Sequence, residues 1–295
     1  MGVTVNAFWH GAPLNPLLWA CMRSFVCRGH AYRLHVYAPV PVPEGVTLVD
    51  AEQILPRSQM FHIQNRFTGR PDIGPFSDLF RYKLLMDEGG WYVDVDTVSM
   101  SSELPDGIRA WAQENEKVEG KVVINGAQLA LPKGDPLARL LYKKCVAIGT
   151  ESPLREDWGP NLLTATLPSL GLPANMFGTT ASFYPIDWIS AFILMMPGHS
   201  DDVRTKANNA LFLAAYQSFF QYCGINLSRM PPAGSYFASL YKEFVPEHMR
   251  PLPYTTEEVL ARVRTFFQSN GSWAVEQLVN SMGDQILDEI GVERP

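Results

Sequence analysis

The feature that most constrains the fold is the alternation of strand-like and helical segments within the first fifty residues. Val3–Phe8, Tyr32–Ala38 and Val46–Val49 are short runs with high β propensity, and apolar residues recur at helical spacing from Leu17 to Val26. A strand–helix–strand order is typical of βαβ units, in which the strands pair in parallel. The sequence therefore predicts an α/β protein with a largely parallel sheet.

The same alternation continues to about residue 150 and then gives way to helices. A helix is expected from Ser77, with Ser or Asp at its cap, to Gly89–Gly90, because glycine commonly ends helices. Further expected elements are a strand at Trp91–Asp96, a strand at Lys121–Leu131, helices at Asp135–Ile148, Asn161–Leu170 and Arg204–Cys223, and two helical segments after Thr256. We expect one domain, residues 1–295, with an α/β half (1–150) and a mostly helical half (151–295).

Composition excludes several classes of protein. The 295 residues are 46% hydrophobic with a net charge of −6, which is incompatible with a disordered chain and argues against binding nucleic acid along a basic face. The four cysteines form no CxxC pair, as expected for free thiols in a reducing compartment. No secretory signal or membrane-spanning segment is recognised, so a cytoplasmic protein is expected.

Two aspartates two positions apart mark the first candidate site. In a strand, Asp94 and Asp96 would share one face, while Val93 and Val95 would pack behind them. Adjacent carboxylates repel each other unless a cation lies between them, and Mg²⁺ or Mn²⁺ prefers such oxygen ligands. The pair predicts a site for a metal and a diphosphate, although an Asp-x-Asp at a solvated strand end is also common.

The helix before this strand carries two more charged residues on one face. Asp78 and Arg81 are three positions apart and can pair with each other or meet a ligand together. The Gly89–Gly90 break leads directly from that helix into the strand, so Asp78, Arg81, Asp94 and Asp96 could converge on one pocket. The alternative is an ordinary surface ion pair of Asp78 with Arg81.

The motif Ser-Asp, then Arg-Tyr, then Gly-Gly-x-Tyr-x-Asp-x-Asp over Phe76–Val98 resembles the DXD-containing sugar transferases. These include the Och1-like mannosyltransferases, the α-1,4-galactosyltransferases, bacterial capsule and lipopolysaccharide transferases, and the clostridial glucosylating toxins. The resemblance implies a GT-A-like fold, a Rossmann-related mixed sheet flanked by helices, with a more helical C-terminal part. It also implies a nucleotide-sugar donor, Mn²⁺ or Mg²⁺, and retention of anomeric configuration.

The resemblance also implies roles for individual residues. Asp96 would bind the metal directly, and Asp94 would contact the donor and reach the metal through water. Asp78 and Arg81 would hold hydroxyls of the transferred sugar. Tyr92 would lie beside the diphosphate or ribose, and Ser77 belongs to the same donor-binding motif.

Two weaker correspondences extend the match. Trp9 follows the first strand and resembles a family tryptophan near the nucleotide base, or it is a core residue. Asn125 resembles a family asparagine of the donor site, or it is a turn residue at a strand end. Trp158–Thr164 resembles a family segment that borders the acceptor, and its Gly-Pro pair could equally begin a helix.

One expected residue is absent. The family usually carries a histidine toward the C-terminus as a metal or phosphate ligand, but Ala210–Tyr216 and Phe267–Trp273, the comparable stretches, contain none. Ser235 or Ser272 could take its place, or catalysis could be weakened. His199 lies too far from either stretch to be assigned this role.

The sequence therefore predicts a metal-dependent retaining glycosyltransferase that uses a nucleotide sugar, with a UDP-sugar favoured, and a glycan or other hydroxyl acceptor. One alternative is a catalytically inactive nucleotide-sugar-binding protein of the same fold. Another is a haloacid-dehalogenase-type phosphatase, in which Asp94 attacks phosphate and Asp96 acts as acid and base.

Overall fold

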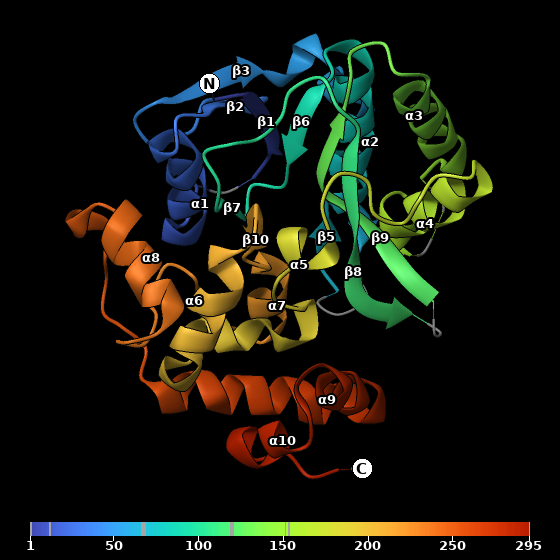
Figure 1. Cartoon of the computed structure of the whole chain (residues 1–295). Coiled ribbons are helices and arrows are strands. Elements are labelled where there is room, and N and C mark those ends of the chain that lie inside the picture. The colour runs from blue at the N-terminus through green and yellow to red at the C-terminus, as the bar shows by residue number, and fades with distance from the viewer. Residues whose placement is uncertain are drawn as a thin grey trace.

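A six-stranded mixed sheet forms the centre of the protein. The computed structural model describes residues 2–294 except 12, 66–68, 119–120, 151 and 153, and excludes the side chains of 115–118 and 121. The strand order is β3-β2-β1-β6-β9-β8 (Figure 1). The strands are β1 (Thr4–Trp9), β2 (Ala31–Val36), β3 (Val46–Asp50), β6 (Gly90–Val93), β8 (Ala110–Val118) and β9 (Lys121–Leu131). The first four in this order are parallel, and β9 is antiparallel to both neighbours.

Helices cover the two faces of this sheet, and the chain after residue 170 is mainly helical (Figure 1). The helices are α1 (Pro16–Cys27), α2 (Gly74–Asp87), α3 (Pro136–Ile148), α4 (Pro160–Ser169), α5 (Thr180–Phe183), α6 (Ser200–Asn208), α7 (Gln217–Tyr222), α8 (Tyr236–Phe244), α9 (Thr256–Met282) and α10 (Gln285–Ile290). This arrangement confirms the predicted α/β class, a mixed sheet flanked by helices with a more helical C-terminal part.

Two antiparallel pairs complete the strands of the described chain. They are β4 (Ile63–Gln64) with β5 (Pro71–Asp72), and β7 (Thr97–Ser99) with β10 (Phe212–Ala214). The pair of β7 with β10 joins the segment after β6 to the C-terminal half of the chain. It therefore brings the predicted site next to residues more than one hundred positions later.

The hydrophobic core is divided by the sheet, as the alternation of side chains in a strand requires. Trp91 and Val93 of β6 pack on the side of α1, together with the C-terminal helices. Tyr92, between them, faces the other side and packs with α2, α3 and α4. The alternation thus places Tyr92 on the same side of the sheet as α2, the helix that carries Arg81.

Several elements begin where local signals predicted. α3 starts at Pro136, and the Asp135 side chain accepts a hydrogen bond from the Leu137 N–H at 2.9 Å. α1 is capped in the same way by Asn15, which accepts from the Leu18 N–H at 3.1 Å. Such caps satisfy N–H groups that have no partner inside the helix, which is why they can be recognised from sequence.

Other expected boundaries were wrong. α2 begins at Gly74, not at Ser77, because Pro75 occupies its first turn and the Asp72 side chain accepts a hydrogen bond from the Gly74 N–H at 2.8 Å. The continuous helix expected over Arg204–Cys223 is instead α6, β10 and α7, with Tyr216 in the left-handed region at φ 49°. Pairing of β10 with β7 outweighs the helical spacing of this segment.

No helix in the described ranges combines the length and the apolar character that a membrane crossing requires.

Candidate active site

Asp94–Asp96 form a turn between β6 and β7 rather than the end of a strand. β6 ends at Val93, and the Thr97 N–H donates to the Asp94 carbonyl at 3.0 Å. The Asp94 N–H in turn donates to the Ala127 carbonyl of β9 at 2.7 Å. The prediction that Asp94 and Asp96 share one face of a strand is therefore wrong. The turn nevertheless holds both residues at the carboxyl end of β6.

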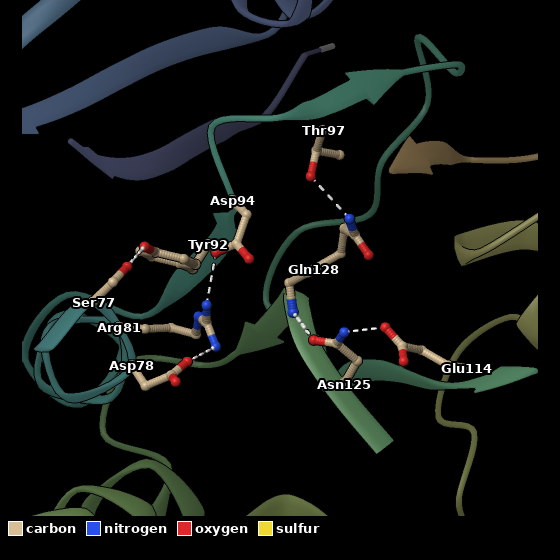
Figure 2. Close-up of polar contacts among 10 residues, drawn as sticks. Ser77, Asp78, Arg81, Tyr92, Asp94, Thr97, Glu114, Asn125 and Gln128 are labelled. Carbon is tan, nitrogen blue, oxygen red and sulfur yellow. Dashed lines mark hydrogen bonds and ion pairs between the residues drawn. The ribbon is translucent and has the colours of Figure 1, made fainter. Parts of the chain in front are cut away.

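Arg81 joins the two acidic segments (Figure 2). Its Nη1 donates to Asp78 Oδ1 at 2.5 Å and its Nη2 donates to Asp94 Oδ1 at 2.7 Å. The side chains of Arg81 and Asp78 are 4% and 12% exposed, whereas that of Asp94 is 35% exposed and so faces solvent. The predicted convergence of Asp78, Arg81 and Asp94 is present, and a surface ion pair does not describe the contact between Arg81 and Asp78.

Burial shifts the titration of this cluster. Burial raises the pKa of Asp78 to about 6, although the adjacent Arg81 guanidinium favours its ionised form. The Nε of Arg81 is buried and has no hydrogen-bond partner in the described part of the chain. Burying a carboxyl group and an unpaired guanidinium N–H lowers the stability of the fold, and functional pockets commonly contain such groups.

Ser77 and Tyr92 line the same side of the sheet. Their hydroxyl groups form a hydrogen bond at 3.1 Å, and the Arg81 guanidinium lies 4.8 Å from the centre of the Tyr92 ring (Figure 2). Tyr92 thus packs against Arg81, and Ser77 holds the Tyr92 hydroxyl. Because Tyr92 is fully buried, its contact with a donor remains a prediction.

Two glycines allow the backbone to approach these side chains. A Cβ atom at Gly126 would lie 2.7 Å from Arg81 Nη1, and one at Gly159 would lie 2.7 Å from Asp78 Oδ2. Gly159 also precedes α4, so the Gly-Pro pair begins a helix as one interpretation expected, and a position beside the acceptor stays a prediction. Any larger residue at these two positions would displace the charged groups.

Asp96 is held by the stretch in which the histidine was expected. Its Oδ2 accepts from the Gln217 N–H at 2.9 Å, and its carbonyl accepts from the Ala215 N–H at 2.8 Å. The segment after β10 thus contributes backbone donors to the site rather than a metal-binding side chain. Burial, followed by the charge of Asp94, raises the pKa of Asp96 to about 6.

The acidic turn fits one class of metal. Two carboxylates that raise each other's energy would be stabilised by a cation, and Mg²⁺ or Mn²⁺ commonly takes one or two carboxylates plus water and substrate phosphates. Among the described residues, no group of three or more His, Cys, Asp or Glu side chains could enclose a metal ion. Asp94 and Asp96 therefore suit a metal that arrives with a diphosphate.

Asn125 lies on β9 beside the turn. Its Oδ1 accepts from the Ala127 N–H at 2.8 Å, and its Nδ2 donates to Glu114 Oε1 on β8 (Figure 2). Asn125 is two residues before Ala127, and the Ala127 carbonyl accepts from the Asp94 N–H, so Asn125 lies beside the acidic turn. Asn125 lies inside β9, so the alternative of a turn residue at a strand end is wrong, and its role in the donor site stays a prediction.

Trp9 ends β1 and is partly buried against the core on the α1 side. The carboxyl end of a parallel strand is where α/β proteins bind ligands. A contact of Trp9 with a base stays a prediction, because the ring also contributes to the core.

Arg155 is a site residue that sequence reasoning missed. Its Nε lies 3.4 Å from Asp72 Oδ2, and its charge acts on Asp78, Asp94 and Asp96. It lies in a short 3₁₀ turn between α3 and α4, in no recognisable motif. Only the tertiary structure brings this second guanidinium toward the acidic cluster.

The two serines considered as replacements for the histidine lie in different surroundings. Ser235 caps α8 by accepting from the Ala238 N–H at 3.1 Å, and it lines a separate cavity of about 550 Å³. Ser272 is exposed on α9. His199 Nε2 contacts Glu289 Oε2 of α10 at 2.9 Å, so it has a partner away from the acidic turn and is not given the role of the absent histidine.

Comparisons with known proteins are sparse for this chain. No family model matches it, and no curated protein matches it. Among solved structures, a chain described as PaToxG Glycosyltransferase is similar, with 12% sequence identity and a TM-score of 0.41 over 73% of this chain and 85% of that chain. At this level the similarity assigns no activity.

Proposed function

We propose that this chain is a metal-dependent retaining glycosyltransferase that takes its sugar from a nucleotide sugar, with a UDP-sugar favoured. The observation that supports this most is the position of Arg81, held between Asp78 and Asp94 beside Asp96. An acidic turn at the carboxyl end of a central strand is suited to a metal–diphosphate, and a buried guanidinium–carboxylate pair is suited to sugar hydroxyls.

The described residues suggest a division of roles. Asp96 would bind Mn²⁺ or Mg²⁺ directly and Asp94 would do so through water, and the metal would supply positive charge for the leaving diphosphate. Asp78 and Arg81 hold the transferred sugar, because their mutual hydrogen bond fixes both groups before the donor binds. Ser77, Tyr92, Trp9 and Asn125 complete the proposed donor site.

Transfer with retention needs no nucleophile from the protein. The acceptor hydroxyl oxygen forms a bond to the anomeric carbon on the face that the diphosphate leaves. The bond between that carbon and the phosphate oxygen breaks, and the electron pair stays with the diphosphate, which receives the hydroxyl proton. The acceptor is a glycan or another hydroxyl compound, and we propose that the reaction takes place in the cytoplasm.

The test is donor turnover. The protein is incubated with Mn²⁺ and UDP-glucose, UDP-galactose, UDP-N-acetylglucosamine or GDP-mannose, and free nucleoside diphosphate is measured. We expect one donor to be hydrolysed by the wild type and by the control Asp201→Asn, which alters an exposed residue of α6. Asp96→Asn should reduce turnover at least a hundredfold, because it removes the charge that binds the metal.

Two other outcomes would contradict this proposal. Binding of a nucleotide sugar without turnover, with candidate acceptors present, would support an inactive binding protein. Phosphate release from a generic phosphomonoester would support the phosphatase, in which Asp94 is the nucleophile. The ion pair of Arg81 with Asp94 Oδ1 disfavours that role, because it withdraws electron density from the carboxylate that would attack.

A further inference from the structure

A buried carboxylate next to the proposed donor site has no role in the function described above. Glu114 lies on β8 and is only 9% exposed. Its Oε1 accepts from Asn125 Nδ2, and Oε2 is not one of the buried, unpaired atoms of the described part of the chain. Both oxygens of a carboxylate accept hydrogen bonds, so Oε2 can accept one from a bound group.

The position of Glu114 is fixed relative to the acidic turn. The Asn125 amide is oriented by the Ala127 N–H, and the Ala127 carbonyl binds the Asp94 N–H at 2.7 Å. Figure 2 shows Asn125 and Gln128 in the space between Glu114 and Asp94. A rigid strand segment therefore connects this carboxylate to the place where the donor is proposed to bind.

Two further polar residues near Glu114 each have one buried atom without a hydrogen-bond partner among the described residues. Gln128 is fully buried and donates to Thr97 Oγ1 at 2.8 Å, but its Oε1 has no hydrogen-bond partner among the described residues. The hydroxyl of Tyr184, which follows α5, is likewise buried and unpaired within the described ranges. The charges of Glu114 and Asp94 both act on Tyr184.

We propose that Glu114, fixed by Asn125, binds the acceptor by accepting a hydrogen bond from its hydroxyl group, and that Gln128 and Tyr184 bind further hydroxyls of the same molecule. This inference rests on the proposed glycosyl transfer. It specifies the acceptor class as an uncharged polyhydroxyl compound, such as a neutral sugar, because a carboxylate repels anionic acceptors and a set of hydroxyl partners favours several hydroxyl groups.

The surroundings of Glu114 determine when it is ionised. Asn125 of β9 donates to it, and the charges of Asp187, before the 3₁₀ helix Trp188–Met195, and of Asp94 oppose its ionisation. The charge of Glu114 also acts on the Tyr184 hydroxyl and opposes its ionisation. Burial is the largest cause and raises the pKa of Glu114 to about 7. The acceptor-binding form is therefore populated above neutral pH.

The test uses Glu114→Gln, with water as the acceptor, at saturating donor and Mn²⁺. The glutamine can still accept from Asn125, but its own amide is a donor as well. We expect kcat for donor hydrolysis to fall about tenfold to a hundredfold, the loss for one hydrogen bond to a charged group, while calorimetry gives an unchanged Kd for UDP with Mn²⁺. The rise of kcat with pH near 7 should disappear, and Glu114→Asp should restore part of it.

The control is Glu257→Gln, at an exposed position of α9, which should match the wild type. A Glu114→Gln protein with wild-type kcat and pH profile overturns the inference. So does a parallel loss of donor affinity, kcat and Tm, because that indicates a structural role. If the wild type neither binds nor hydrolyses any donor, the proposed function itself fails. If the wild type binds UDP and hydrolyses a donor but Glu114→Gln behaves like it, only the inference about Glu114 fails.

Discussion

Arg81 carries both the stability and the proposed chemistry of the site. It is the cation shared by Asp78, which is buried, and Asp94, which is open to solvent. The guanidinium reaches the two carboxylates from two separate nitrogens, Nη1 and Nη2, whereas a lysine would have to reach both from a single nitrogen. This explains why Asp78 can be buried without a second cation in direct contact among the described residues.

Replacing Arg81 with methionine should lower the free energy of unfolding by about 3 kcal/mol, because breaking a buried ion pair leaves an uncompensated carboxylate. Urea denaturation measures this loss. Adding Asp78→Asn to the same protein should recover part of it, and Arg139→Met, on the exposed face of α3, serves as the control. A loss below about 1 kcal/mol would mean that the pair is not stabilising in solution.

The Asp96 carboxylate, in contrast to Arg81, should lower the stability of the folded protein at neutral pH, although the proposed activity requires it. Its pKa in the folded protein, about 6, is above the ordinary value of 3.8, so folding favours its protonated form. That stabilising contribution is complete below about pH 4 and is lost as the pH rises through 6. Asp96→Asn does not titrate and can still accept from the Gln217 N–H.

We therefore expect Asp96→Asn to be more stable than the wild type at pH 7.5, by on the order of 1 kcal/mol, and equal to it near pH 4. Denaturation curves of both proteins at both pH values give the difference in their free energies of unfolding. Groups that titrate equally in the two proteins contribute nothing to this difference. One such group is His35, whose pKa burial lowers to about 4. A variant that is less stable at pH 7.5 would contradict the assigned cost of the buried charge.

At the scale of elements, the site is formed where four segments meet: α2, the turn after β6, β9 and the chain before α7. Each supplies either a charged side chain or the backbone that fixes one. A Cβ atom at Gly126 of β9 would lie 2.7 Å from Arg81 Nη1 of α2 and 3.1 Å from Leu163 Cδ1 of α4. The fit between these elements, rather than any one motif, sets the position of the guanidinium.

Gly126→Ala tests this fit. The added methyl group would lie 2.7 Å from Arg81 Nη1, so the guanidinium must move, and turnover of the donor should fall tenfold or more. Overpacking should also cost about 1 kcal/mol of stability. Gly198→Ala is the matched control, since its Cβ would meet no atom within 4 Å. Equal kinetics of the two variants would show that Arg81 is not held by this contact.

The elements that sequence reasoning predicted well are those with local signals. α3 and α4 have a proline in their first turn, and the βαβ order of β1, α1 and β2 follows from spacing alone. The expected helix over Arg204–Cys223 failed because β10 gains more from pairing with β7 than its residues gain from helical spacing. Propensity is a weak prior when tertiary pairing competes with it.

For the whole molecule, binding of metal and nucleotide should be visible as stabilisation. A ligand at a hundred times its Kd adds about 2.7 kcal/mol to the free energy of unfolding, which raises Tm by roughly 5 °C or more for a chain of this size. We expect Mn²⁺ with UDP to produce this shift in differential scanning calorimetry, and either one alone to produce less. Asp96→Asn should abolish it, and a shift retained in that variant would place the metal elsewhere.

The sequence by itself determined the α/β class, the order of the first strands, and the helix and glycine break that lead from Asp78 and Arg81 to the two aspartates. These depend on short-range effects, namely caps, glycine breaks and the alternation of side chains. Only the tertiary structure decided that Asp94–Asp96 form a turn, that the N–H groups of Ala215 and Gln217 at the start of α7 donate to Asp96, and that Glu114 and Arg155 lie near the site. The contacts of Asp96 and Arg155 join residues far apart in the chain, and Glu114 meets Asn125 across two neighbouring strands. No local pattern encodes such pairing, because packing around the sheet is what brings these residues together.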